Sequence, residues 1–107
     1  MTSTAELTLE AQLSQAGIPF EREYRFAPPR RWRADFWVRT FGIDVLVEID
    51  GGAFIGGRHS RGAGVEADAE KQSAAAILGY RVIRCTPAQV DDGRALEWIR
   101  QALGIAA

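Results

Sequence analysis

The chain has 107 residues, a formal net charge of -1 and 47% hydrophobic residues, so it has the length and the apolar content for one small domain with its own core. The near-neutral charge excludes an overall basic surface for nucleic acid or membranes, and any anionic partner must be held by a local patch. One cysteine, Cys85, and one histidine, His59, exclude a disulfide framework and metal sites built from several cysteines or histidines. Metal sites with oxygen ligands remain open.

The expected compartment follows from two further features. No segment approaches the roughly 20 consecutive apolar residues that would span a bilayer. The first ten residues, MTSTAELTLE, lack the basic and apolar regions of a signal peptide. We therefore expect a cytoplasmic protein without a membrane partner, with residues 1–107 forming a single domain.

In chain order, the first two predicted elements are a helix over residues 4–16 and a strand over residues 21–26. Apolar residues recur at helical spacing in the first segment, which opens with the capping-box pair Ser3 and Glu6 and stops at Gly17. The second segment, EREYRF, alternates in character and ends at two prolines, which is typical of a short strand.

Two more strands are predicted over residues 31–40 and 43–50, joined by Phe41 and Gly42. Alternate positions of the first run are apolar and are expected to share one face: Trp32, Ala34, Phe36 and Val38. The opposite face of that run carries Asp35, and the second run places Glu48 and Asp50 on one face. We interpret the pair as a hairpin, because Gly42 suits the positive φ of a tight turn.

The remaining chain reads as a glycine-rich loop over residues 51–64, a helix over 65–78, a strand over 80–86 and a last helix capped by Asp91 or Asp92. The element order is therefore α-β-β-β-α-β-α. This order predicts a single α/β domain whose mixed four-stranded sheet is flanked by helices.

The hairpin register brings two carboxylates together. If Phe41 and Gly42 form the turn, Thr40 faces Ile43 and paired residue numbers always sum to 83, which sets Asp35 opposite Glu48. Opposed side chains on one face have Cβ atoms about 5 Å apart, so the two charges repel unless a cation lies between them. The oxygen ligands suit Mg²⁺ or Mn²⁺.

A simpler interpretation stays open beside this one. Glu48 and Asp50 would lie on an exposed sheet face and form ordinary surface ion pairs with Arg33 and Arg31. Against it, the run IDVLVEID is too apolar for an open edge strand, and charges inside a buried strand are typical of functional sites.

Five sequence words in order resemble the PD-(D/E)XK restriction-endonuclease-like superfamily, above all its small phage and bacterial domains related to very-short-patch-repair endonucleases. They are RWRADF, VEIDGG, GRHSRGAG, DAEKQ and GYRVIRCTPAQV, and they span nearly the whole chain. The resemblance implies the fold of that superfamily, metal-dependent hydrolysis of DNA phosphodiesters and a role in DNA repair or recombination. DNA would be the partner, and a homodimer would be one way to cut both strands.

The resemblance also implies a metal shell. Asp35 and Glu48 would hold Mg²⁺ (or Mn²⁺) together with the carbonyl of Ile49, and Glu10 or Glu6 on the first helix resembles an acidic residue that some members add. The chain departs from the pattern at Asp50, where the family commonly has Lys. Two alternatives remain: Asp50 is a further ligand, or Lys71 reaches the site from the second helix, where it shares a face with Asp68 and Gln72.

The remaining candidates are cationic. His59 would contact a phosphate or position water, and Arg31, Arg33, Arg58 and Arg61 would contact the DNA backbone. The sequence thus favours a metal-dependent DNA endonuclease. A catalytically inactive DNA- or protein-binding module on the same fold is the alternative that Asp50 keeps open, and an RNA-directed nuclease is the third.

Overall fold

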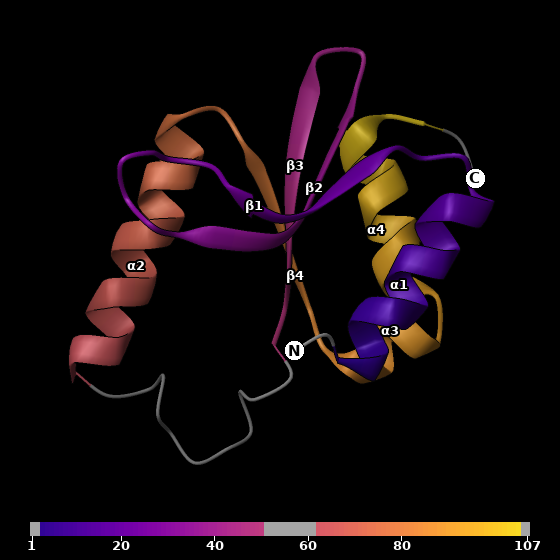
Figure 1. Ribbon diagram of the computed structural model, residues 1–107, viewed down its shortest axis with the longest axis horizontal. Helices are drawn as coiled ribbons and strands as arrows, with labels where there is room; N and C mark the ends of the chain where they lie inside the picture. The colour runs from indigo at the N-terminus through magenta and orange to yellow at the C-terminus, as the bar shows by residue number, and fades with distance from the viewer. Residues whose placement is uncertain (1–2, 51–61, 106–107) are drawn as a thin grey trace.

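The computed structural model describes residues 3–50 and 62–105. Along the chain the elements are α1 (Thr4–Gln15), β1 (Phe20–Arg25), β2 (Arg33–Thr40), β3 (Ile43–Ile49), α2 (Gly62–Ile77), β4 (Arg81–Cys85), α3 (Pro87–Asp91) and α4 (Arg94–Leu103). The sheet has the order β1-β2-β3-β4, with β3 and β4 parallel and the other neighbours antiparallel. The predicted α/β fold class is confirmed, with α2 on one side of the sheet and α1, α3 and α4 on the other (Figure 1).

From Phe36 to Thr40 the β2–β3 hairpin has the predicted register, but its ladder does not contain the predicted pair of Asp35 with Glu48. Phe36 pairs with Val47 and Thr40 with Ile43, so the paired numbers sum to 83. The turn residues Phe41 and Gly42 have φ values of 54° and 80°, the paired positive angles that join antiparallel strands in two residues. This turn therefore fixes which side chains of the two strands stand beside each other.

Two apolar clusters, one on each side of the sheet, hold the layers together. The larger joins α1 and α4 to the sheet and includes Leu9, Phe36, Val47 and Ile99, all of which are fully buried. The smaller lies under α2 and contains Phe26, Ala34, Leu46 and Ala75. Strand β3 contributes to both clusters, because its side chains alternate: Val45 and Val47 pack in the larger cluster and Leu46 packs in the smaller one.

The predicted face of the first hairpin strand is wrong at one point. Trp32 and Ala34 pack in the α2 cluster, whereas Phe36 and Val38 pack in the α1 and α4 cluster, although strict alternation would put all four on one side. The cause lies in the neighbouring strand, where Glu23 has a φ of 51° and the ladder between β1 and β2 has no paired residues at Glu23 and Asp35. At this interruption the carboxylate of Asp35 reaches toward β3, where it accepts a hydrogen bond from the Ile49 N–H.

The C-terminal segment contains a short helix that the sequence did not lead us to expect. Thr86 caps α3 through a reciprocal capping box with Gln89, so the chain turns helical five residues before the predicted start. Asp91 therefore ends α3 and does not cap the last helix, whereas Asp92 accepts a hydrogen bond from the Arg94 backbone N–H at 3.0 Å. No helix in the described part of the chain is long and apolar enough to cross a membrane.

Candidate active site

Asp35 lies in β2 at the interruption of its ladder with β1, beside the carboxyl end of β3. Its Oδ2 accepts a hydrogen bond from the Ile49 backbone N–H at 2.7 Å. Burial raises the pKa of Asp35 above its ordinary value, and the negative charge of Glu23 adds to the rise, while the hydrogen bond from Ile49 opposes it. The folded protein thus holds this carboxylate where its charge is poorly solvated.

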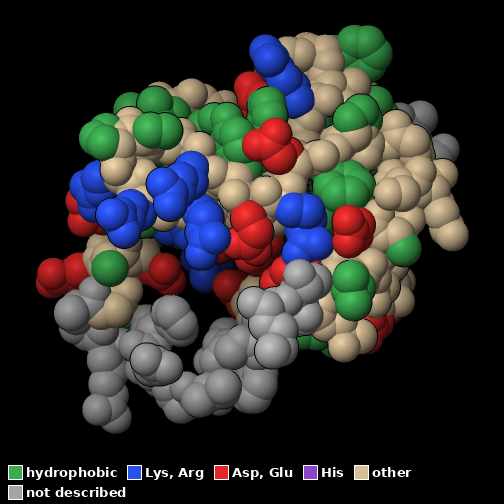
Figure 2. All heavy atoms as spheres, in the orientation of Figure 1, with side chains coloured by type: hydrophobic (Ala, Val, Ile, Leu, Met, Phe, Trp, Pro, Cys, Tyr) green, Lys and Arg blue, Asp and Glu red, His purple; other side chains and the backbone are tan. Residues whose placement is uncertain are grey.

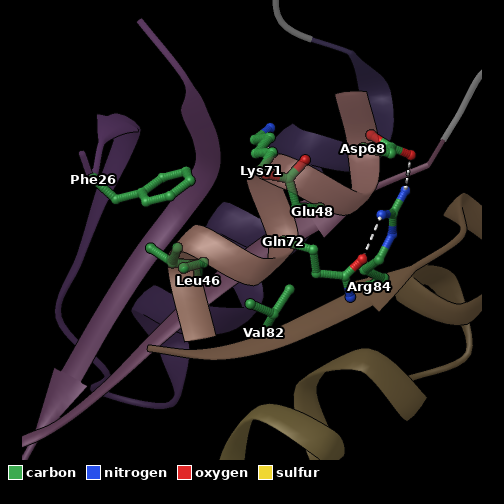
Figure 3. A pocket seen from close by; sticks show the side chains of 9 residues that line it. Phe26, Leu46, Glu48, Asp68, Lys71, Gln72, Val82 and Arg84 are labelled. Atoms are coloured by element: carbon green, nitrogen blue, oxygen red, sulfur yellow. Dashed lines mark hydrogen bonds and ion pairs between the residues drawn. The ribbon is translucent and has the colours of Figure 1, made fainter. Parts of the chain in front are cut away.

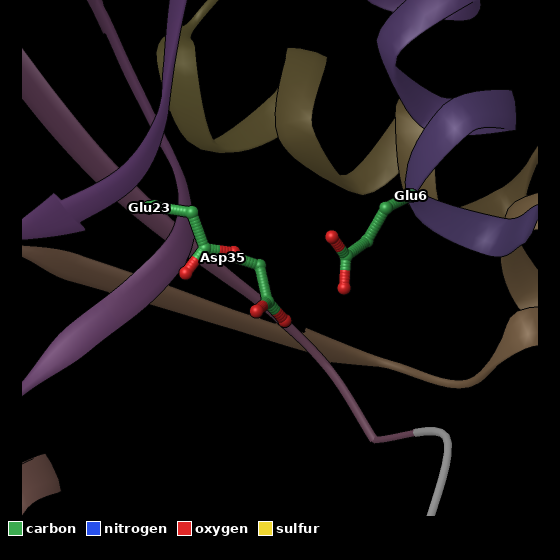
Figure 4. Close-up of side chains that lie close together, drawn as sticks. All are labelled: Glu6, Glu23 and Asp35. Atoms are coloured by element: carbon green, nitrogen blue, oxygen red, sulfur yellow. The ribbon is translucent and has the colours of Figure 1, made fainter. Parts of the chain in front are cut away.

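Two further carboxylates approach Asp35 from separate elements. Glu6 of α1, Glu23 of β1 and Asp35 each place one carboxylate oxygen so that the three lie within 4.8 Å of one another. Figure 4 shows Glu6 extending from the helix toward the two strand residues. Glu23 reaches this position because its positive φ turns the strand there. Oxygen donors from three elements fit a hard divalent cation such as Mg²⁺ or Mn²⁺.

Arg22 is the cation built into this side of the site. Its guanidinium donates to Glu6 Oε1 and, at 3.2 Å, to Glu10 Oε1. Glu10, the acidic residue placed in the expected metal shell, is therefore paired with Arg22, and its alternative, Glu6, is the helix residue in the carboxylate cluster. Neither Glu23 nor Arg22 was predicted to belong to the site. The positive φ that brings Glu23 there cannot be read from the alternation of polar and apolar residues.

Glu48 lies on the α2 side of the same strand end. Lys71 Nζ is 3.0 Å from Glu48 Oε2 and donates to the Arg33 carbonyl at 2.9 Å. Burial raises the pKa of Glu48, and the charge of Asp35 contributes to the rise, while Lys71 opposes it. The charge of Asp35 therefore acts on Glu48, and Lys71 reaches Glu48 from the second helix.

Asp50 is paired with a residue that the sequence analysis did not single out. Arg84 of β4 donates to both carboxylate oxygens of Asp50, from Nε at 3.0 Å and from Nη2 at 2.9 Å. The interpretation that Asp50 and Glu48 pair with Arg33 and Arg31 is wrong, because the parallel β3–β4 register sets Arg84 beside Glu48. Arg33 pairs with Glu23 instead, at 3.2 Å.

A pocket between α2 and the sheet is lined by three residues of these ion pairs, Glu48, Lys71 and Arg84. Apolar side chains line part of it, and Glu48, Asp68, Lys71 and Arg84 supply the charged part of the lining (Figure 3). Arg84 also reaches Gln72 Oε1 at 3.5 Å and Asp68 Oδ2 at 3.6 Å on the helix. The predicted shared face of Asp68, Lys71 and Gln72 is therefore the face of α2 that borders this pocket.

The backbone at the end of β3 is held by β4. The Asp50 N–H donates to the Cys85 carbonyl at 2.7 Å, and Cys85 Sγ donates to the Glu48 carbonyl at 3.7 Å. Burial raises the pKa of the Cys85 thiol to about 11, so the side chain stays a neutral thiol at neutral pH. Cys85 is thus a packing residue beside the site, as expected for a cysteine inside a strand.

The basic residues that were predicted to contact DNA fall into two groups, one inside and one outside the described residues. Arg31 and Arg33 are exposed on the segment that leads into β2. Figure 2 shows Lys and Arg side chains gathered on one face next to a group of Asp and Glu side chains. His59, Arg58 and Arg61 lie outside the described residues.

Comparison with known proteins gives one result about the fold. No family model matches the sequence, and no curated protein matches it. Among solved structures, the chain is similar to the catalytic domain of the homing endonuclease I-Bth0305I, with a TM-score of 0.62 and 18% sequence identity over 96% of this chain and 92% of that chain. The chain therefore shares the fold of this catalytic domain over nearly its whole length.

Proposed function

We propose that this protein is a metal-dependent DNA endonuclease of the PD-(D/E)XK type. The observation that supports it most strongly is that Asp35 lies at the end of β3, the strand that carries Glu48. Asp35 accepts a hydrogen bond from Ile49, the residue after Glu48, and its charge adds to the rise in the pKa of Glu48 that burial causes. The similarity to a homing endonuclease catalytic domain over nearly the whole chain supports the same function.

In this proposal Asp35 and Glu48 hold Mg²⁺ (or Mn²⁺), with the carbonyl of Ile49 as a third ligand and Glu6 in the place first given to Glu10. A bound divalent cation would lower the pKa of a coordinated water and neutralise charge on the phosphoryl oxygens. Two carboxyl groups with raised pKa values fit this role, because a cation would remove the repulsion that burial makes costly.

The protein's own residues supply the other parts of the reaction. Lys71, held 3.0 Å from Glu48, brings the positive charge that the family pattern places at residue 50, and it would orient the attacking water and stabilise the phosphoryl charge. Arg31 and Arg33, together with Arg58 and Arg61, would bind the DNA backbone and set its register, and His59 would act beside them.

The test is a cleavage assay with purified protein, supercoiled and single-stranded DNA, and Mg²⁺ or Mn²⁺. Asp35→Ala and Glu48→Ala should each abolish cleavage, whereas Glu21→Ala, an exposed carboxylate on β1, should leave it unchanged. Cleavage that survives both site substitutions would show that the metal ligands have been placed wrongly. Loss of cleavage in the Glu21 variant would point to an effect of surface charge alone.

A second candidate function is a DNA- or protein-binding module on the same fold. The observation that favours it is Asp50 in place of Lys, with both of its oxygens bound by Arg84. Protein that binds DNA but cleaves neither DNA nor RNA with any divalent cation would support the binding module. Cleavage of RNA alone would redirect the proposal to an RNA nuclease on the same residues.

A further inference from the structure

We propose that Arg84 is a positioning residue whose ion pair with Asp50 fixes the Ile49 carbonyl in its ligand direction. Arg84 and Asp50 would act as one unit, called here the Arg84–Asp50 clamp, and neither would touch the metal or the substrate. The inference rests on the proposed function, because it concerns the metal held beside Asp35. It assigns a role to Arg84 and removes Asp50 from the set of ligands.

The side chains of Arg84 and Asp50 form a two-point ion pair. Arg84 Nε and Nη2 donate to the two oxygens of Asp50 at 3.0 and 2.9 Å, the paired arrangement in which a guanidinium matches a carboxylate best. Each oxygen of Asp50 thus already has a charged donor. A carboxylate bound in this way is poorly available as a metal ligand, since binding a metal would require breaking the fork.

The peptide between Ile49 and Asp50 has a fixed orientation. The Asp50 N–H points toward β4, where the Cys85 carbonyl accepts it at 2.7 Å. In a planar trans peptide the N–H and C=O point in opposite directions, so the Ile49 carbonyl points away from β4 and toward the β2 side. The N–H of Ile49 points the same way and donates to Asp35. Both polar backbone groups of Ile49 therefore point toward β2, and the N–H reaches the carboxylate of Asp35.

Contacts of Asp50 with β4 hold this peptide in place. Asp50 follows the last residue of β3, where the ladder ends and the backbone would be free to rotate. The clamp ties its side chain to β4, and Arg84 also reaches Asp68 on α2 at 3.6 Å. The charge pair and the backbone hydrogen bond to Cys85 thus hold one peptide from both its side chain and its N–H.

The experiment compares Arg84→Met, Asp50→Asn and the double variant with the wild-type protein, with Arg84→Lys as a conservative variant. Arg81→Met is the matched control, an arginine on the same strand whose Nη1 donates to the Ala102 carbonyl. Calorimetry measures Mn²⁺ binding by the metal-free proteins, and kinetics separate kcat from KM for DNA. Thermal unfolding identifies any variant that has lost its fold, in which case Arg84→Lys, which keeps the charge, carries the test.

We expect Arg84→Met and Asp50→Asn each to weaken Mn²⁺ binding about tenfold, as is typical when a residue that orients a ligand is removed. The double variant should be no weaker than the worse single variant, because both changes remove one clamp. Arg84→Lys should lie between wild type and Arg84→Met, since an ammonium cannot form the fork. The KM for DNA should stay unchanged while kcat falls.

Other results would overturn the clamp. Asp50→Asn that abolishes Mn²⁺ binding while Arg84→Met preserves it would make Asp50 a ligand. Arg84→Met that raises KM for DNA without changing Mn²⁺ affinity would place Arg84 on the phosphate backbone. Wild-type protein that binds no Mn²⁺ would overturn the proposed function and the clamp together, whereas unchanged Mn²⁺ binding in every variant would overturn the clamp alone.

Discussion

The carboxylates on the two sides of the β3 end are neutralised in different ways. On the α2 side, Glu48 pairs with Lys71 and Asp50 pairs with Arg84. On the α1 side, Asp35 accepts a backbone hydrogen bond, and no Lys or Arg among the described residues lies within ion-pair distance of its carboxylate. The α2 side therefore carries its own cations, whereas Asp35 still needs one.

This difference explains why a metal belongs near Asp35 in the proposed mechanism. Arg22 and Arg33 neutralise Glu6 and Glu23, but the pKa of Asp35 stays raised because burial and the charge of Glu23 outweigh the nearby cations. A buried carboxylate without a cation lowers the stability of the fold, and such a cost is typical of a functional site. The fold thus pays for a site that a divalent ion would complete.

The largest expected effect among further variants belongs to the α2 side. Lys71→Met should lower the rate of DNA cleavage about 100-fold or more, because the ammonium beside Glu48 is the cation proposed to act on the phosphoryl charge. Single-turnover cleavage at saturating Mg²⁺ measures this. Arg100→Met, which removes a cation from α4, is the control and should cleave as wild type does. Full activity in Lys71→Met would make the Lys71–Glu48 pair purely structural.

A smaller effect should separate two acidic residues of α1. Glu6 belongs to the carboxylate cluster and Glu10 does not, although both pair with Arg22. Glu6→Gln should weaken Mn²⁺ binding about tenfold, whereas Glu10→Gln should change it by less than about threefold. Calorimetric titration of both variants measures the difference. A larger loss for Glu10→Gln would restore Glu10 to the metal shell.

The smallest effect is on stability and has the opposite sign to the loss of activity. Asp35→Asn should raise the free energy of unfolding of the metal-free protein by about 1 kcal/mol at pH 7, because it removes a buried charge while keeping an acceptor for the Ile49 N–H. Chemical denaturation in the presence of a chelator measures this. A variant less stable than wild type would show that the carboxylate charge is already satisfied.

The pH dependence of stability tests the same point. The raised pKa means that the folded protein binds this proton more tightly than the unfolded chain does. The stabilisation from protonated Asp35 is therefore full at low pH and is lost as pH rises from about 4, the ordinary value for Asp, through the raised pKa. Metal-free wild type should lose stability over this window relative to Asp35→Asn. Parallel curves for the two proteins would contradict the assignment.

The sequence predicted the parts of the site that depend on local rules. The hairpin register followed from Phe41 and Gly42 alone, because a two-residue turn permits one pairing of the strands. The grouping of Asp68, Lys71 and Gln72 followed from helical spacing. Both results concern residues whose relative positions are set within one turn or one helix.

The parts that could not be predicted depend on irregular backbone or distant pairing. Glu23, whose carboxylate lies with those of Asp35 and Glu6, has a positive φ that no alternation of residue types signals. The Arg84–Asp50 pair joins residues 34 positions apart through the parallel β3–β4 ladder, whose register no turn specifies. Pairing across a long connection must therefore be taken from the structure.

The most direct test of the central claim is to locate Mn²⁺ by anomalous X-ray scattering in crystals of the wild-type protein. We expect one ion between the carboxylates of Asp35 and Glu48, on the side toward which the Ile49 carbonyl points. An ion bound by Glu6, Glu23 and Asp35 without Glu48, or no ion at this strand end at millimolar Mn²⁺, would contradict it.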